Sequence, residues 1–291
     1  MENGGLQGEQ GERGLQGERG FNCKQGISGN ISDICPTDTN LELQFVPEVI
    51  NNGYIVTCSL NNLLIYVTWV DNTPGNGEIF FAAINDNGTT FDNPINISNN
   101  NGPSTRQQIA AVENYVYVTW EDSTVGNPNP EIYFAVSDDF GQTFSAPINL
   151  SNNTGFSEVP QIAAVGDHVY VTWEDNINRN TLDNFDIFLA VSSDNGKKFS
   201  PPKNISNNTG FSAFSKIAAV GDNVYVIWKE DTSANTNSEI FFAASNKNGQ
   251  NFDAPLNISN IIGISELARI AAVGDNVYVT WHDNTFAITG K

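Results

Sequence analysis

A short β-type phrase that ends in tryptophan recurs five times along this 291-residue chain, at nearly constant intervals. It reads Ile-Tyr-Val-Thr-Trp at 65–69 and Val-Tyr-Val-Thr-Trp, or its Ile variant, in the later copies. The tryptophans are Trp69, Trp120, Trp173, Trp228 and Trp281, spaced by 51, 53, 55 and 53 residues. A period near fifty, built from short β segments and turn residues, is typical of β-propeller blades rather than helical solenoids.

Each repeat contains four candidate strands. The first reads Ile-Ala-Ala-Val, as at 109–112, and its small alanines suit an innermost position; a Gly-Asp hairpin turn leads to the Trp strand. The Trp strand and the third strand, such as 78–83, are apolar on both sides, which indicates that both faces are covered. The fourth contains a proline, which an edge strand tolerates; its copies are 91–98, 144–151, 199–206 and 252–259. We therefore predict an all-β fold, a five-bladed β-propeller of four-stranded blades over residues 41–291.

The fifth repeat runs only a short way beyond Trp281. Residues 42–52 echo the fourth-strand pattern and are expected to supply the missing outer strand beside Phe286–Thr289. The strand either closes the ring within one molecule or is lent to a neighbouring molecule, so that subunits join head to tail.

The N-terminal residues 1–21 have a different pattern. Glycine occupies every third position from Gly5 to Gly20, which resembles the collagen-like stretches of microbial surface proteins. A flexible Gly-rich linker is the alternative. Residues 22–40 are expected to be a linker in which Cys23 and Cys35 form a disulfide that closes a short loop, whereas Cys58 is expected to be a buried free thiol.

The charge balance excludes several classes of partner. The chain has 13 Lys and Arg against 33 Asp and Glu, a net charge of −20, which would repel phosphate backbones, so a nucleic-acid partner is not expected. It contains no apolar run of the length that spans a membrane and no visible secretory signal.

The turn between the third and fourth strands resembles the Asp-box of the sialidase-like propellers. Its best copy consists of Ser137, Asp139, Gly141, Thr143 and Phe144. In that family the box is a structural hairpin whose Ser and Asp cap turn amides and whose aromatic residue lies between strands. Sialidases also use three arginines, a Tyr–Glu pair and an Asp. Arg106, Arg179 and Arg269 match the number of arginines but not the pattern, so the resemblance assigns no catalytic residue.

An acidic residue stands two positions after each tryptophan, where the chain enters a long polar loop. These carboxylates either form a ring that binds calcium or bond to their own loop amides: Asp71, Asp122, Asp175, Glu230 and Asp283. No other cofactor is expected. In the loops, Phe156, Phe211 and Phe214 serve either as sugar platforms or as loop anchors. Sequons for N-glycosylation, unless they only reflect blade duplication, begin at Asn96, Asn149, Asn152, Asn204, Asn207 and Asn257.

These features lead to two functional expectations. The first is a non-enzymatic extracellular or cell-surface structural or adhesion protein that assembles with copies of itself through its N-terminal segment and strand exchange. The alternative is a glycan-binding propeller or a sialidase-like glycoside hydrolase.

Overall fold

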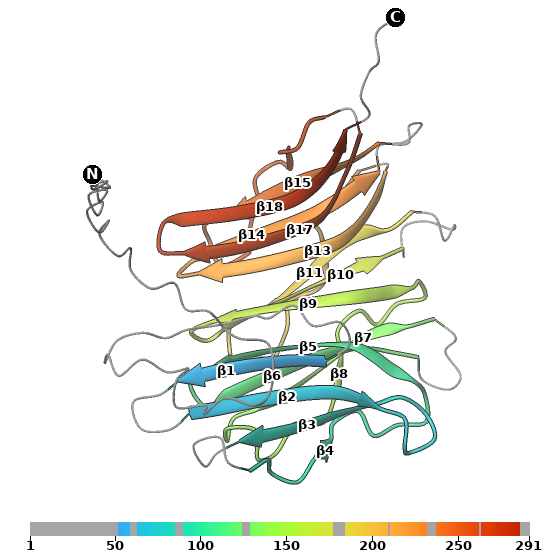
Figure 1. The fold of residues 1–291 in the computed structure, drawn as a ribbon, viewed down its shortest axis with the longest axis vertical. Helices are drawn as coiled ribbons and strands as arrows, with labels where there is room; N and C mark the ends of the chain where they lie inside the picture. The colour runs from blue at the N-terminus through green and yellow to red at the C-terminus, as the bar shows by residue number, and fades with distance from the viewer. Residues whose placement is uncertain are drawn as a thin grey trace, which may run out of the picture.

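The computed structural model describes residues 52–58, 63–84, 90–123, 129–176, 184–208, 210–231, 237–261 and 263–285. These residues form strands and turns only, without a helix. Figure 1 shows the sheets stacked as a row, with the first sheet at one end and the last hairpin at the other. Within this part of the chain, nothing helical is long and apolar enough to cross a membrane.

The strands form three four-stranded antiparallel sheets and one six-stranded sheet. In the six-stranded sheet a single parallel pair, Ser238 with Ile264, joins the last hairpin to a fourth four-stranded unit. We call the four-stranded units blades 1 to 4 and the hairpin blade 5. Blade 1 is β1 (Asn52–Cys58), β2 (Leu63–Asp71), β3 (Glu78–Ile84) and β4 (Ile95–Asn96). Blade 2 is β5 (Ser104–Val112), β6 (Tyr115–Asp122), β7 (Glu131–Ser137) and β8 (Ile148–Asn149). Blade 3 is β9 (Ser157–Val165), β10 (His168–Asp175), β11 (Asp186–Ser192) and β12 (Lys203–Asn204). Blade 4 is β13 (Phe211–Val220), β14 (Asn223–Asp231), β15 (Ser238–Ser245) and β16 (Leu256–Asn257), and blade 5 is β17 (Gly263–Val273) and β18 (Asn276–Thr285).

The first strand of every blade is the inner one. β1, β5, β9, β13 and β17 contact one another in succession along the row. The alanines of the Ile-Ala-Ala-Val segments therefore lie where the sheets approach most closely, as their small size predicts. The all-β prediction is confirmed. The total number of blades stays a prediction, because residues 42–51 and 286–291, which would complete the fifth, lie outside the described residues.

The outer strands are much shorter than the sequence predicts. We expected eight-residue strands, but each outer strand makes only two residue pairs with its neighbour, for example Phe134 with Ile148 and Tyr133 with Asn149. Proline directly before the pair has no N–H for the ladder. The asparagine that ends the pair then accepts a hydrogen bond from the N–H three residues later, 2.8 Å for Asn149 and Asn152, which turns the chain away.

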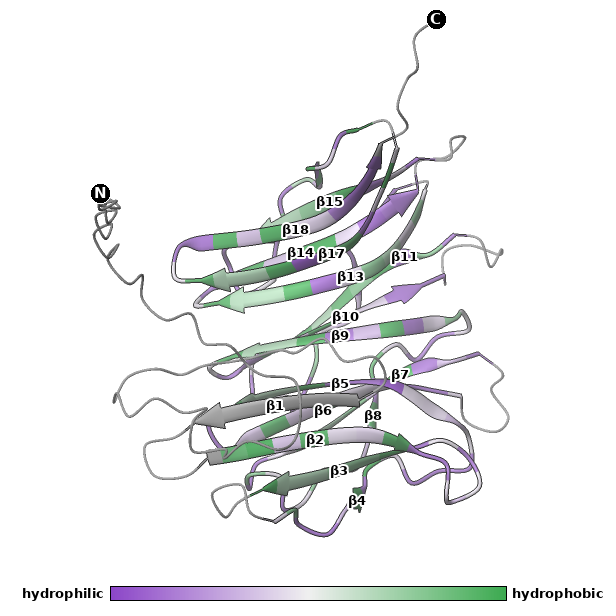
Figure 2. Ribbon diagram, viewed as in Figure 1, coloured by the Kyte–Doolittle hydropathy of each residue, from purple (hydrophilic) through white to green (hydrophobic). Residues whose placement is uncertain are grey.

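Adjacent blades are joined by a repeated contact between a turn and a tyrosine. The turn glycine of one blade packs on the second-strand tyrosine and third-strand aromatic of the preceding blade: a Cβ at Gly196 would lie 2.7 Å from Phe134 and 3.6 Å from Tyr117. Phe199, from the same turn, packs edge-on against Phe134, with ring centroids 4.8 Å apart. Figure 2 shows the resulting distribution, with apolar residues along the strands and polar residues toward strand ends and loops.

The turns themselves are held by their own polar side chains. The Ser137 hydroxyl accepts hydrogen bonds from the N–H groups of Asp139 and Gly141, and Asp139 accepts one from the Thr143 N–H at 2.9 Å. Ser192 and Asp194 repeat this arrangement in blade 3. A carboxylate and a hydroxyl thus replace backbone partners in a tight turn.

Candidate functional site

Every inner strand of blades 2 to 5 contains a β-bulge opposite the repeat tryptophan. Within each bulge one residue has a positive φ: Arg106 (53°), Val159 (52°), Phe214 (56°) and Leu267 (56°). Positive φ is unfavourable for residues other than glycine, and bulges of this kind re-aim backbone and side-chain groups. The four bulges lie on the inner strands near the loop-bearing end of the blades.

Two buried glutamates use the N–H groups that these bulges present. The Glu121 carboxylate accepts a hydrogen bond from the N–H of Val159 in the next blade, at 3.4 Å. The Glu174 carboxylate accepts one from the N–H of Phe214, again in the next blade, at 2.7 Å. The equivalent contact therefore occurs twice, between blades 2 and 3 and between blades 3 and 4.

Charged side chains gather around these two glutamates. The Arg106 guanidinium lies 2.5 Å from Glu121 and 3.5 Å from Glu158 of the adjacent inner strand. Lys216 donates a hydrogen bond to Gln161 at 3.2 Å. The charges of Glu158 and Arg106 act on Glu174, and that of Glu174 acts on Lys216. We call Arg106, Glu121, Glu158, Glu174 and Lys216 the inner-strand cluster.

Blade 3 places two carboxylates side by side. Glu158 of β9 and Glu174 of β10 are direct partners in the antiparallel register, so their side chains project from the same face. Like charges in that arrangement are unfavourable. The corresponding pairs are Thr105 with Glu121 in blade 2 and Ala213 with Lys229 in blade 4, neither of which opposes two acids.

Burial shifts the pKa values of several cluster residues away from those of ordinary surface groups. It raises the pKa of Glu174 to about 7, against the hydrogen bond from Phe214. Burial also raises the pKa of Glu121, although Arg106 opposes the shift, and lowers the pKa of Lys216. Glu158 is the more accessible acid, with 28% of its side chain exposed against 11% for Glu121. A protonated carboxyl beside an accessible carboxylate is a combination suited to acid–base chemistry.

The acids expected to bind calcium lie on the other face of their strands. Asp175 accepts hydrogen bonds from Trp173 Nε1, Ser157 and Asn153 at 2.8–2.9 Å. Asp122 and Glu230 bind the equivalent Trp, Ser and Asn groups, Asp283 binds Ser265, and Asp71 binds its own loop at Thr73. All of these acids except Asp71 tie a strand end to the neighbouring strand. Across the described ranges no three His, Cys, Asp or Glu side chains gather as metal ligands.

The other predicted residues are dispersed. Phe214 is exposed beside the cluster, whereas Phe211 packs edge-on against Phe185 and the Phe156 carbonyl accepts a hydrogen bond from Asn176. The sequon asparagines Asn96, Asn149, Asn204 and Asn257 lie in the short outer strands, and Asn152 and Asn207 follow them on exposed turns. Cys23, Cys35 and Arg179 lie outside the described residues, as does the side chain of Cys58.

Sequence reasoning missed the glutamates of the inner-strand cluster. Each of blades 2 and 3 has Trp-Glu-Asp at the end of its second strand, and the prediction of metal ligands selected the aspartate. Strand alternation was the available signal: if the aspartate shares a face with the tryptophan, the glutamate between them points to the opposite face, toward the next blade.

Comparison with known proteins identifies the fold. No protein-family model and no curated sequence matches the chain. Among solved structures, it is similar to the GH93 α-L-arabinofuranosidase of Fusarium graminearum in complex with arabinobiose, at 13% identity and a TM-score of 0.54, over 75% of this chain and 71% of that one. It is also similar to the α-L-arabinanase of Penicillium chrysogenum complexed with arabinobiose, at 10% identity and a TM-score of 0.53, over 82% and 87%. The fold is that of these β-propeller glycosidases.

This finding corrects our first functional expectation. The non-enzymatic structural or adhesion role is contradicted, because the solved structures that share the fold are glycoside hydrolases. The prediction had taken the lack of a recognisable sialidase pattern as evidence against catalysis. The alternative, a glycan-binding or glycoside-cleaving propeller, agrees better with the comparisons.

Proposed function

We propose that this protein is a glycoside hydrolase whose active site is the inner-strand cluster. The observation that carries the proposal is the cross-strand pair of Glu158 and Glu174, in which burial raises the pKa of Glu174 to about 7. Glycoside hydrolysis requires two carboxyl groups in different protonation states, one to protonate the leaving oxygen and one to act as nucleophile or base.

The environments of the two groups define their proposed roles. Glu174 is the general acid, because burial raises its pKa to about 7, so the carboxyl is mostly protonated in weakly acidic solution. Glu158 is the second carboxylate, because it is more exposed and lies beside the Arg106 guanidinium. Arg106 is placed to hold the Glu158 carboxylate or a sugar hydroxyl, and the exposed ring of Phe214 offers a face for stacking against a sugar.

Register partners in an antiparallel pair have Cβ atoms about 4.5–5.5 Å apart, and glutamate side chains that extend in parallel from them hold their carboxyl groups at a similar separation. Retaining glycosidases hold their two carboxyl groups about 5–5.5 Å apart, whereas inverting enzymes need room for a water between them. We therefore propose retention of configuration at the anomeric carbon, with Glu158 as the nucleophile. Proton nuclear magnetic resonance of the first product formed would report the stereochemistry directly.

Arabinan and arabinobiose are the first substrates to test, since similar folds have been solved with arabinobiose. We expect Glu158→Gln and Glu174→Gln each to lower kcat about 100-fold or more, the usual effect of losing an acid–base group. Glu266→Gln is the matched control: Glu266 has the same place in its repeat as Glu158 but pairs with His282 and lies outside the cluster. Equal loss in all three variants, or unchanged kcat in Glu174→Gln, would contradict the assignment.

A glycan-binding module without cleavage is the second candidate. It is favoured by the bonds that tie Glu121 and Glu174 to bulge N–H groups, which give these acids a structural task as well. Calorimetric binding of arabino-oligosaccharides with no release of reducing sugar by the wild-type protein would support this candidate over hydrolysis.

Several finer expectations remain proposals beside this one. The hydrogen-bonded turns at Ser137 and Ser192 support a relationship to the Asp-box propellers. An extracellular location agrees with the proposed glycan substrate. Calcium binding by the five Trp-proximal acids, a homo-oligomeric assembly and the collagen-like segment stay predictions; a change in melting temperature on chelation would test the first, and light scattering the second.

A further inference from the structure

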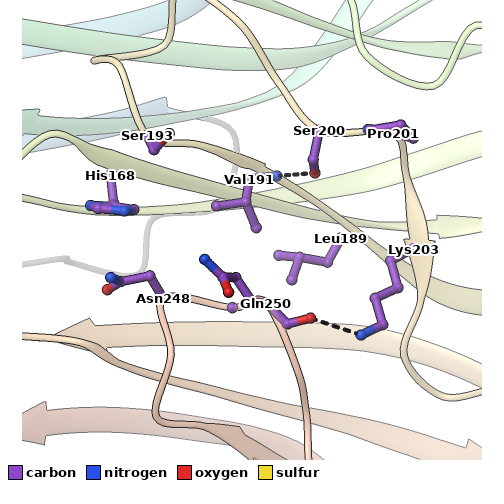
Figure 3. Close-up of a pocket in the computed structure, with 10 residues that line it drawn as sticks. His168, Leu189, Val191, Ser193, Ser200, Pro201, Lys203, Asn248 and Gln250 are labelled. Atoms are coloured by element: carbon purple, nitrogen blue, oxygen red, sulfur yellow. Dashed lines mark hydrogen bonds between the residues drawn. The ribbon is translucent and has the colours of Figure 1, made fainter.

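A cavity of about 380 Å³ lies between blades 3 and 4. It opens between the third and fourth strands of blade 3 and the turn that joins β15 to β16, with His168 on one side and Asn248 and Gln250 on the other (Figure 3). His168 begins β10, whereas Glu174 stands six positions later near its end, so the two sites are roughly 20 Å apart at the usual rise of a strand. The cavity is therefore separate from the inner-strand cluster.

The joint between blades beside this cavity lacks the aromatic residue that the two preceding joints have. The third-strand position that packs against the next turn is Phe81 in blade 1 and Phe134 in blade 2, and each carries a turn phenylalanine edge-on at 4.8 Å. In blade 3 this position is Leu189, which lines the cavity. A leucine is smaller than a phenylalanine and cannot make the edge-on ring contact of the other two joints, so the wall of the cavity is aliphatic here.

The lining of the cavity is chemically distinct from the rest of the protein. The residues that line it include no Asp or Glu, although the chain has 33 acids against 13 Lys and Arg. They do include Lys203 and His168. The Lys203 ammonium among lining residues without a carboxylate offers a local partner for an anion in a protein of net charge −20.

Two polar side chains of the cavity, Lys203 and His168, have hydrogen-bonding atoms available for a ligand. Lys203 donates one hydrogen bond to the Gln250 carbonyl, at 3.1 Å, and an ammonium group has two further N–H donors. Asp167 holds His168 Nδ1 at 2.6 Å, which leaves Nε2 as the ring nitrogen for a ligand hydroxyl. Leu189, Val191 and Pro201 form an apolar wall beside these groups.

We propose that this cavity binds a small polyhydroxylated carboxylate, such as a uronic acid. Lys203 binds the carboxylate, His168 and the side chains of Asn248 and Ser193 bind hydroxyl groups, and the apolar wall contacts the C–H face of the sugar ring. The volume lies within the range of small-molecule sites, about 300–1,000 Å³.

The test uses the histidine side-chain signals of the full-length protein, which has two histidines. We expect D-glucuronate to shift the His168 signals in a saturable way and to leave those of His282, in blade 5, unchanged. D-glucose and acetate, titrated at the same pH and ionic strength, should each bind at least tenfold more weakly, because each lacks one half of the recognition. No saturable shift with glucuronate, or equal binding of acetate, would overturn the proposal.

Two variants link the shift to this cavity. Lys203→Gln should weaken glucuronate binding about tenfold, the value of one charge-assisted hydrogen bond. Leu189→Phe should weaken it about tenfold by pushing a larger ring into the apolar wall of the cavity, with a melting curve to verify folding. Glu174→Gln should leave binding intact, which separates this site from the proposed active site. Unchanged affinity in folded Leu189→Phe would place the ligand elsewhere.

Discussion

At the scale of single residues, the central feature is a pair of glutamates that the fold holds opposite each other. Glu158 and Glu174 are register partners on β9 and β10, and both cannot be ionised there without mutual repulsion. Burial resolves the conflict by raising the pKa of Glu174 to about 7. The folded state is less stable when both acids are charged. Strongly shifted pKa values of this kind are concentrated at functional sites.

The raised pKa predicts a pH dependence of folding. The ordinary pKa of Glu174 is 4.5 and its folded value is about 7, so the folded state binds the proton more tightly than the unfolded state. Stability from this group is therefore fully present below pH 4.5 and is lost as the pH rises to about 7. We expect urea unfolding to show a loss on the order of 3 kcal/mol across this window, absent in Glu174→Gln. An identical pH profile in both proteins would contradict the assignment.

At the scale of elements, the bulged inner strands and the turn–tyrosine joints position the site. The bulges of blades 3 and 4 each turn an N–H toward the preceding blade, where Glu121 and Glu174 accept it. In the turns between third and fourth strands, Gly141, Gly196 and Gly249 each pack on a tyrosine of the preceding blade. The distance between neighbouring inner strands, and hence the spacing of the cluster, follows from these joints.

Comparing two glycines distinguishes the cost of a side-chain clash at a joint between blades from the cost of an unfavourable backbone angle. Gly196 and Gly221 both have positive φ, 78° and 54°, but a Cβ would strike Phe134 only at Gly196 and would meet nothing within 4 Å at Gly221. We expect Gly221→Ala to cost about 1 kcal/mol of unfolding free energy through the backbone alone. Gly196→Ala should cost about 1–3 kcal/mol more through the clash. Equal costs in denaturant unfolding would argue against a tight joint.

The sequence predicts the regular parts of these elements well and their irregular parts poorly. Alternation and apolar content locate the inner, second and third strands, because each strand is defined by its own residues. The outer strands contract to two residues because proline and the asparagine turn interrupt pairing. The bulges at Arg106 and Val159 depend on pairing between strands, and Glu121 contacts residues in two different blades. No local pattern contains that information.

At the scale of the whole molecule, the described blades form a row with two different ends (Figure 1). The second-strand tyrosines differ in exposure along this row. Tyr117 and Tyr170 are fully buried, each with a following blade packed on it, whereas Tyr278 of blade 5 is 59% exposed. Leu267 and Val273 are exposed on the same hairpin.

The difference between these tyrosines can be measured. We expect Tyr170→Ala to cost about 3–5 kcal/mol, as for a buried aromatic residue, and Tyr278→Ala to cost less than about 1 kcal/mol. Thermal and urea unfolding of both variants would give the comparison. A large cost for Tyr278→Ala would mean that another part of the chain, or a second copy, covers blade 5 in solution.

The most direct test of the account is a crystal structure of Glu174→Gln soaked with arabinobiose, because this substitution removes the proposed proton donor and should preserve the bound substrate. We predict the glycosidic oxygen of the ligand next to residue 174 and the anomeric carbon next to the Glu158 carboxylate, with Arg106 in contact with the ligand or with Glu158. A ligand bound away from the inner strands, with the cluster filled only by its own ion pairs, would contradict the proposal that these glutamates form a glycosidase active site.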